Sequence, residues 1–196
     1  MRRVTWTVLL TVFAVIIVWG WSAGSSAATE QRDKVVSDYK YAWPRASDVS
    51  LNGHWQLAFT DSDASLSVTG GLENLAWFDT EVPTEVHWAL YRAGKAPHPY
   101  VGLNISQMRW VEDKAWWFRR RFTAPKSFRA AQVRLVFEGV DYYARYWLNG
   151  RYLGRSEGAF GAVKFVITDL LRYGGENELI VRVECGGYKL GRPGGA

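Results

Sequence analysis

Apolar and polar residues alternate along several short stretches of the chain, most clearly between positions 133 and 154. Val133, Leu135 and Phe137 are separated by other residues, which is the pattern of a strand with one buried face. A second strand is predicted from about Tyr142 to Leu148, and Asn149-Gly150 follows it. Because Asn and Gly both tolerate positive φ, this pair predicts a two-residue type I′ hairpin turn.

A two-residue turn also fixes the register of the hairpin. It predicts that Leu148 faces Arg151, Trp147 faces Tyr152 and Tyr146 faces Leu153. Ala144, Tyr146 and Leu148 then share one face of their strand, and Tyr143, Arg145 and Trp147 share the other.

Further alternating runs predict strands near residues 55–59, 77–82, 116–122, 163–167 and 179–183. Their apolar faces predict a core that contains Trp55, Phe118, Phe137, Tyr146, Leu148 and Val181. Pro83 and the prolines and glycine of residues 97–104 predict a long irregular loop, with a short helical turn near 105–111. Several short strands separated by turn signals favour an all-β sandwich.

The first 28 residues have the layout of a secretory signal peptide. A basic start at Arg2 and Arg3 precedes an uncharged run from Val4 to Trp21, and small residues follow to Ala28. The run is close to the minimum length of a spanning helix, so an uncleaved signal anchor is the alternative. In either case we expect a secreted or periplasmic chain, or one anchored in the membrane by this segment. We expect residues 29–48 to be a linker and residues 49–184 the sandwich, with a Gly-rich tail or truncated linker at 185–196.

Composition excludes several classes of function. The formal net charge of +5 falls to +3 without Arg2 and Arg3, which is too mild to predict a nucleic-acid partner. Cys185 is the only cysteine, so neither an intrachain disulfide nor a cysteine-based metal site is possible. The three histidines are far apart and show no ligand spacing, and we expect no metal and no cofactor.

The run from Phe137 to Gly154 resembles the N-terminal sugar-binding domain of glycoside hydrolase family 2, in its β-mannosidase and exo-glucosaminidase branches. Other matching pieces follow in family order: Leu51-x-Gly53-x-Trp55-x-Leu57, Val82-Pro83, Pro99-Tyr100-Val101-Gly102-x-Asn104, Trp117-Phe118-Arg119-Arg120-x-Phe122, Glu157-Gly158-x-Phe160 and Gly175-x-Asn177-x-Leu179-x-Val181. His98 stands where the family usually carries Asp before the loop proline. The resemblance implies a jelly-roll sandwich of the galactose-binding kind.

The resemblance also implies a function. Family 2 enzymes carry both catalytic carboxylates in a later (β/α)₈ barrel, which this sequence lacks, so we expect no catalytic residues here. Asp141 and Glu157 are the two acidic residues that could be considered for catalysis. We expect Asp141 to cap a turn and Glu157 to make a loop contact instead. The chain is thus expected to be an exported sugar-binding domain, truncated before its barrel, whose partners are carbohydrate and that barrel. The alternative is a self-standing carbohydrate-binding or adhesion module at the cell surface.

Asn104 and Tyr100 are the candidate substrate-binding residues, and both belong to the loop that begins at Pro99. In the galactosidase branch of the family, the Asn of a similar loop reaches into the pocket of the barrel. An amide offers both donors and an acceptor, as a sugar hydroxyl does. The alternative is that Asn104 binds the backbone of its own loop, as Asn commonly does in turns.

Overall fold

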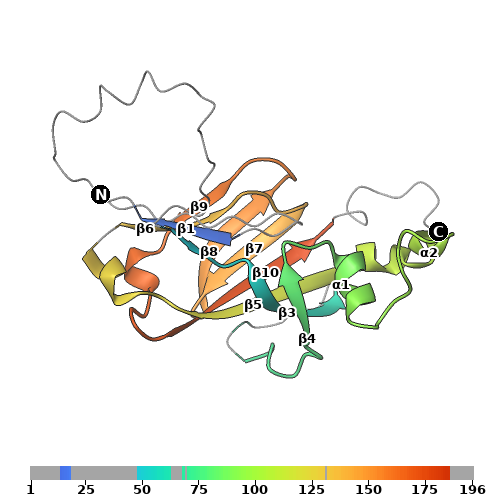
Figure 1. Cartoon of the computed structure of the whole chain (residues 1–196), viewed down its shortest axis with the longest axis horizontal. Coiled ribbons are helices and arrows are strands. Elements are labelled where there is room, and N and C mark those ends of the chain that lie inside the picture. The colour runs from blue at the N-terminus through green and yellow to red at the C-terminus, as the bar shows by residue number, and fades with distance from the viewer. Residues whose placement is uncertain (1–13, 19–47, 63–67, 69, 131, 186–196) are drawn as a thin grey trace, which may run out of the picture.

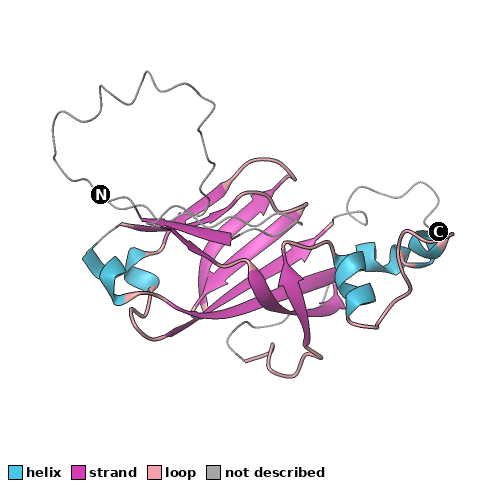
Figure 2. Ribbon diagram, in the orientation of Figure 1, coloured by secondary structure: helices cyan, strands magenta, loops and turns pink. Residues whose placement is uncertain are grey.

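The protein is described by a computed structural model over residues 14–18, 48–62, 68, 70–130 and 132–185. Its described part consists mainly of strands in two antiparallel sheets, with short helices at both ends (Figures 1 and 2). Most of the predicted signal segment, nearly all of the predicted linker and residues 186–196 of the predicted tail lie outside the described residues. The expected all-β class is therefore confirmed, whereas the predicted boundaries of signal, linker and tail stay predictions.

The larger sheet contains six strands, each antiparallel to its neighbours. Their order is β4 (Phe78–Val82), β3 (Gly53–Asp61), β5 (Lys114–Thr123), β10 (Glu176–Glu184), β7 (Tyr143–Leu148) and β8 (Arg151–Glu157). The smaller sheet has the order β2 (Asp48–Ser50), β1 (Ala14–Val18), β6 (Val133–Phe137) and β9 (Val163–Val166), again antiparallel throughout.

The helical segments connect strands at the two ends of the sheets. They are α1 (Val86–Arg92), α2 (Asn104–Gln107) and the 3₁₀ turns η2 (Arg109–Asp113), η3 (Lys126–Ala130) and η4 (Thr168–Leu170). Figure 1 shows α1 and α2 together at one end of the molecule. Among the described residues, no helix combines the length and the apolar character that a membrane crossing needs.

The facing sides of the two sheets form the main hydrophobic core. Trp55, Phe118, Phe137, Tyr146, Leu148 and Val181 are all at most 1% exposed, so the predicted core is confirmed. The rings of Phe137 in the small sheet and Tyr146 in the large sheet lie 4.4 Å apart between centroids. Each strand alternates in side-chain direction, and the apolar set of each therefore meets that of the opposite sheet.

The predicted β7–β8 hairpin forms, with one correction to its register. Asn149 and Gly150 have φ values of 51° and 79°, as a type I′ turn requires. Leu148 pairs with Arg151 and Trp147 with Tyr152, as predicted. The prediction that Tyr146 faces Leu153 is wrong, because an irregularity between Tyr146 and Trp147 shifts the pairing and Gly154 lies opposite Tyr146.

The outer face of the large sheet carries a second, smaller cluster that the strand patterns did not predict. Leu72, Trp117 and Ile180 are buried there. The Trp77 indole donates to the carbonyl of Leu72 at 2.8 Å, and the guanidinium of Arg119 lies 4.0 Å from the centre of the Trp77 ring. The segment that leads into β4 therefore covers this face, so β5 is buried on both sides at its centre.

The expected long loop between β4 and β5 contains more helix than predicted. A short helical turn was expected only near residues 105–111, whereas α1 already begins at Val86. Val86, Ala89 and Leu90 are buried, at the i, i+3 and i+4 spacing of one helical face. The interpretation of residues 82–87 as the passage into a long loop therefore missed α1, whereas residues 93–103 contain no helix, as expected for most of the segment 97–104.

The end of the sandwich opposite α1 is closed by a buried amide network. Asn177 is fully buried, and its side-chain oxygen accepts from the Asn149 amide at 2.9 Å and from the Arg172 backbone N–H at 2.8 Å. Its amide nitrogen donates to the carbonyls of Arg172 and Gly175, both at 3.0 Å. The Asn149 amide nitrogen also donates to the Leu170 carbonyl at 2.8 Å. These contacts tie the hairpin turn to the start of β10.

Candidate functional site

A pocket of about 770 Å³ opens at the α1 end of the sandwich. Its walls come from five separate parts of the chain: the start of α1, the loop before α2, the η2–β5 junction, the segment before β7 and the end of β10. The lining residues are Pro83, Thr84, Glu85, Val86, His87, Trp88, His98, Tyr100, Val111, Glu112, Trp116, Asp141, Val183 and Cys185. A cavity of this size falls within the range of small-molecule binding sites.

The aromatic side chains of Trp88, His98 and Tyr100 line the pocket, and a fourth, Tyr91, packs against two of them. We call Trp88, Tyr91, His98 and Tyr100 the aromatic cluster. The rings of Trp88 and Tyr100 are stacked at 6.3 Å between centroids, and the ring of His98 lies 5.3 Å from Trp88 and 4.7 Å from Tyr91. Tyr100 is 67% exposed, so one face of this cluster is open to a ligand.

The loop that carries Tyr100 is fixed by local hydrogen bonds. The backbone N–H of Tyr100 donates to Nδ1 of His98 at 3.2 Å, and the side-chain amide of Asn104 donates to the His98 carbonyl at 2.9 Å. Gly102 has a φ of 56°, which a residue with a Cβ rarely adopts. The shape of the loop is thus set before any ligand arrives.

Glu85 connects this loop to the start of α1. The Tyr100 hydroxyl donates a hydrogen bond to a carboxylate oxygen of Glu85. This hydrogen bond, followed by partial burial, raises the pKa of Tyr100 above its ordinary value. The Tyr100 hydroxyl therefore stays protonated and continues to donate its hydrogen bond to the Glu85 carboxylate.

Carboxylates supply the charge of the pocket. Glu85, Glu112 and Asp141 all line it, and none of the described lining residues is Lys or Arg. The pocket thus offers hydrogen-bond acceptors to hydroxyl groups and disfavours an anionic ligand. Among the described residues, no group of three or more His, Cys, Asp or Glu side chains is arranged to hold a metal ion.

The two residues predicted to bind substrate have different places in this geometry. Tyr100 lines the pocket, whereas Asn104 is the first residue of α2 and is not part of the lining. The amide of Asn104 holds the backbone of its own loop, which is the alternative that the sequence left open. A direct contact between Asn104 and a ligand stays a prediction.

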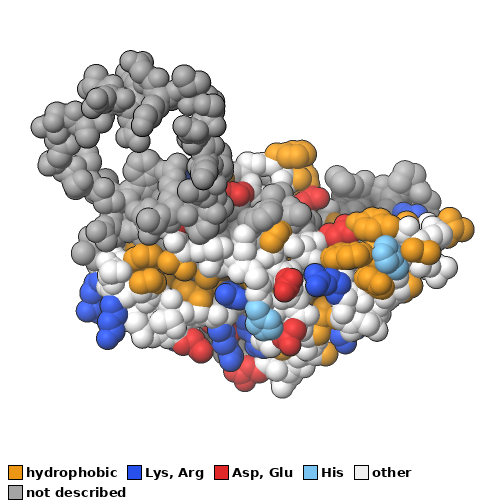
Figure 3. Space-filling model, viewed as in Figure 1, with side chains coloured by type: hydrophobic (Ala, Val, Ile, Leu, Met, Phe, Trp, Pro, Cys, Tyr) orange, Lys and Arg blue, Asp and Glu red, His pale blue; other side chains and the backbone are white. Residues whose placement is uncertain are grey.

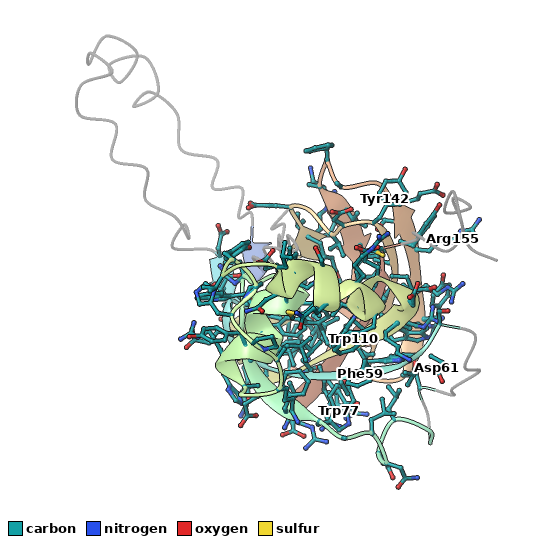
Figure 4. The ribbon with its side chains drawn as sticks, turned by 90° about the vertical axis from the view of Figure 1, so that its right-hand side faces the viewer. Phe59, Asp61, Trp77, Trp110, Tyr142 and Arg155 are labelled. Atoms are coloured by element: carbon teal, nitrogen blue, oxygen red, sulfur yellow. The ribbon has the colours of Figure 1, made fainter. Side chains whose placement is uncertain are left out.

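Asp141 and Glu157 do not share a pocket. Asp141 lines the large pocket, whereas Glu157 ends β8 and lines a smaller cavity with Tyr143, Arg145 and Arg155. Arg155, which lines the smaller cavity, is labelled in Figure 4. A glycosidase needs two carboxyl groups that flank one bond of the sugar, and these two line different cavities rather than facing one site.

The surface around the pocket exposes large apolar side chains. Figure 3 shows them gathered over the α1 and α2 end of the molecule. Val101, Leu103 and Ile105 are 57%, 76% and 42% exposed. In Figure 4, Phe59 and Trp110 lie side by side at this end, and their ring centroids are 5.6 Å apart. An apolar surface of this kind marks a site of contact with another molecule or domain.

Most of these site residues could not be recognised from the sequence. Glu85 and Trp88 lie at the start of α1 and Trp116 lies in β5, and only the fold brings them to one cavity. Tyr100 was predicted from the resemblance of its loop to the family. The helical spacing of Val86, Ala89 and Leu90, which leaves Trp88 off the buried face of α1, is a signal that could have pointed to a second site residue.

Comparison with known proteins gives matches to longer enzymes. The chain is 35% identical over 111 residues to β-mannosidase B of Emericella nidulans and 32% identical over 115 residues to that of Aspergillus niger. These alignments cover 56% and 58% of this chain, but only 13% and 14% of the fungal proteins.

Solved structures give the same result. The crystal structure of β-D-mannosidase from Dictyoglomus thermophilum superposes on 71% of this chain and 16% of its own, with a TM-score of 0.60 and 33% identity. β-Glucuronidase from Ruminococcus gnavus shares the fold alone, with a TM-score of 0.52 and 21% identity over 69% of this chain and 21% of its own.

The chain thus spans about a seventh of the length of the mannosidases that it matches. The family described as "Glycosyl hydrolase 2 galactose-binding domain-like" matches residues 55–188, which is more than half of the chain. This stretch contains most of β3, all of the later strands with the hairpin, and all of the pocket residues. The chain therefore belongs to the galactose-binding-like domain family of glycoside hydrolase family 2.

Proposed function

We propose that this chain is the sugar-binding jelly-roll domain of an exported, β-mannosidase-like family 2 glycoside hydrolase, and that its pocket receives a neutral pyranose. The observation that carries the proposal is the pocket wall formed by Trp88 and Tyr100 beside the carboxylate of Glu85. A pyranose has apolar C–H faces that stack on aromatic rings and hydroxyls that donate to carboxylates. The similarity to the mannosidases supports a mannoside as the first ligand to test.

In this proposal the α1 end also faces a catalytic barrel. Leu103 is 76% exposed and Tyr100 is 67% exposed, which is costly for a surface that stays in water. A neighbouring domain that covers these side chains would complete the pocket and hold the second half of the substrate site.

A self-standing module held at a membrane is the second candidate, but it leaves this apolar surface without a partner. A coding region for a barrel downstream of residue 196 would favour the enzyme, and its absence would favour the module.

Sugar binding is tested by titrating the protein with mannose and with β-1,4-linked mannobiose. Chemical shifts of the Trp88 indole and the Tyr100 ring should move saturably, because both line the pocket. Trp88→Ala should weaken binding at least about tenfold, the equivalent of one lost ring contact of about 1.4 kcal/mol. Tyr152→Ala is the matched control, since Tyr152 is a half-exposed aromatic residue on β8 outside the pocket.

Two results would contradict the proposal. Shift changes spread equally over Tyr152 and the pocket would show that the sugar has no site. Binding of glucuronate as tight as that of mannose would contradict the charge argument, because three carboxylates line the cavity.

We also expect the isolated chain to release no nitrophenol from aryl mannosides, glucosaminides or galactosides. Activity that is lost in Glu157→Gln would overturn that expectation.

A further inference from the structure

The smaller sheet is held together by the chain's own N-terminal strand. β1 lies between β2 and β6 and is antiparallel to both. Five residues, from Ala14 to Val18, pair with β6, and three of them also pair with β2. Because adjacent strands are about 4.8 Å apart, β2 and β6 are separated by a gap of about 10 Å that only a strand can fill.

β6 needs a neighbour on this side. Its other edge is already paired with β9. Val133, Leu135 and Phe137 of β6 are at most 1% exposed and contribute to the main core. Without β1, the backbone N–H and C=O groups on that edge would lose their partners, beside an apolar core.

The sequence of β1 suits this position. Ala-Val-Ile-Ile-Val contains four β-branched residues and no charge, Gly or Pro, which is the composition of a strand buried within a sheet. The same residues lie inside the run from Val4 to Trp21 that predicts export. The composition of residues 14–18 thus suits both a strand inside a sheet and the apolar core of a signal segment.

We propose that the groove between β2 and β6 is a strand-acceptor site and that residues 14–18 are its donor strand, a structural part of the folded chain. A chain that begins at Thr29 lacks the donor and exposes the acceptor. Backbone pairing on two sides would give the donor its affinity, as in other cases where an extended segment is added to a sheet. This inference does not depend on sugar binding, and it concerns the chain that retains residues 14–18 rather than one from which the predicted signal segment has been removed.

The test uses the whole chain, produced inside the cell so that its first residues are retained. A protease recognition sequence is inserted between Ser22 and Ala28, and the folded protein is then cut. We expect the N-terminal fragment to co-elute with the remainder on size exclusion. The N–H groups of Leu135 and Val136 point to opposite edges of β6, and the one that faces β1 should also stay protected from hydrogen exchange after the cut.

Non-specific adhesion of an apolar fragment is separated from strand pairing by a proline. Ile16 pairs with both Val49 and Leu135, so Ile16→Pro removes a backbone donor at the centre of β1 while the fragment stays apolar. We expect fragment release to be on the order of tenfold faster than in the parent, since at least one net hydrogen bond is lost. Val8→Pro, which lies outside β1, is the matched control and should behave like the parent.

Three outcomes would overturn the proposal. The fragment of the parent could separate at once, with the melting temperature of the remainder unchanged. The Ile16→Pro fragment could be retained as long as the parent fragment, which would show adhesion without pairing. Finally, whichever amide of Leu135 and Val136 faces β1 could exchange fast in the uncut protein as well as in the cut one, which would show that no strand covers that edge.

Discussion

The two ends of the sandwich differ in which kind of side chain is buried and which kind is exposed. At the hairpin end, polar amides are buried: Asn177 is fully enclosed and makes four hydrogen bonds. At the α1 end, apolar side chains are exposed, and Leu103 and Tyr100 have most of their surface in water. The first arrangement satisfies the hydrogen-bonding groups of the Asn177 side chain within the domain, whereas the second leaves apolar surface available for another molecule or domain.

This contrast indicates that the hairpin end contributes mainly to stability and the α1 end mainly to binding. A buried amide whose donors and acceptors are all satisfied specifies one arrangement of the chain, because any other leaves a polar group unpaired. An exposed aromatic surface contributes little to folding and is suited to binding. We therefore expect substitutions at the hairpin end to change the free energy of unfolding, and substitutions at the α1 end to change ligand binding.

The largest effect is expected for Leu148→Ala. Leu148 is fully buried next to the hairpin turn, and its truncation should lower the free energy of unfolding by about 2–5 kcal/mol. Leu103→Ala is the matched variant at the α1 end and should change it by less than about 0.5 kcal/mol. Urea unfolding followed by tryptophan fluorescence measures both. Equal losses in the two variants would remove the distinction between the ends.

A smaller loss is expected for Asn177→Ala. The substitution leaves the Asn149 amide and the Arg172 N–H without their acceptor, which should cost about 1–3 kcal/mol. Glu176→Ala, at the exposed neighbouring position, is the control and should cost less than about 0.5 kcal/mol. The same urea experiment applies. If the two variants were equally stable, the amide network would contribute nothing to the closed end.

The smallest effect concerns the titration of Tyr100. Its hydrogen bond to Glu85 raises its pKa, so the neutral hydroxyl is favoured in the folded protein. The contribution of this contact is complete below the unfolded-state pKa of about 10, and it is lost as the pH rises through the higher folded pKa. Glu85→Gln removes the carboxylate, and we expect the pKa of Tyr100 to fall. Carbon NMR of the tyrosine Cζ atoms would measure it, and an unchanged titration would show that the contact has no effect in solution.

The sequence predicted those parts of the fold that depend on local patterns. Alternation placed Trp55, Phe118 and Leu148 in the core, and Asn149-Gly150 specified the turn, because both signals act between near neighbours in the chain. The pairing of Tyr146 with Gly154 was missed because an irregular pairing has no separate sequence signal.

Features that depend on distant parts of the chain were predicted less well. The prolines around α1 concealed a helix whose apolar spacing was present in Val86, Ala89 and Leu90. The pocket combines residues from positions 83 to 185, so its existence follows only from the completed fold. Tyr100 was predicted as a site residue from a family resemblance, and Trp88 was not predicted at all.

The end of β10 has a consequence for any longer chain that contains this domain. Val183 and Cys185 both line the pocket, so whatever follows Cys185 is tethered at the rim of the cavity. A domain attached through a short flexible linker has an effective concentration in about the millimolar range near the point of attachment. A following domain could therefore cover the pocket for much of the time even if the contact itself had a dissociation constant of about 1 mM. Tethering at this point would make a weak interface sufficient.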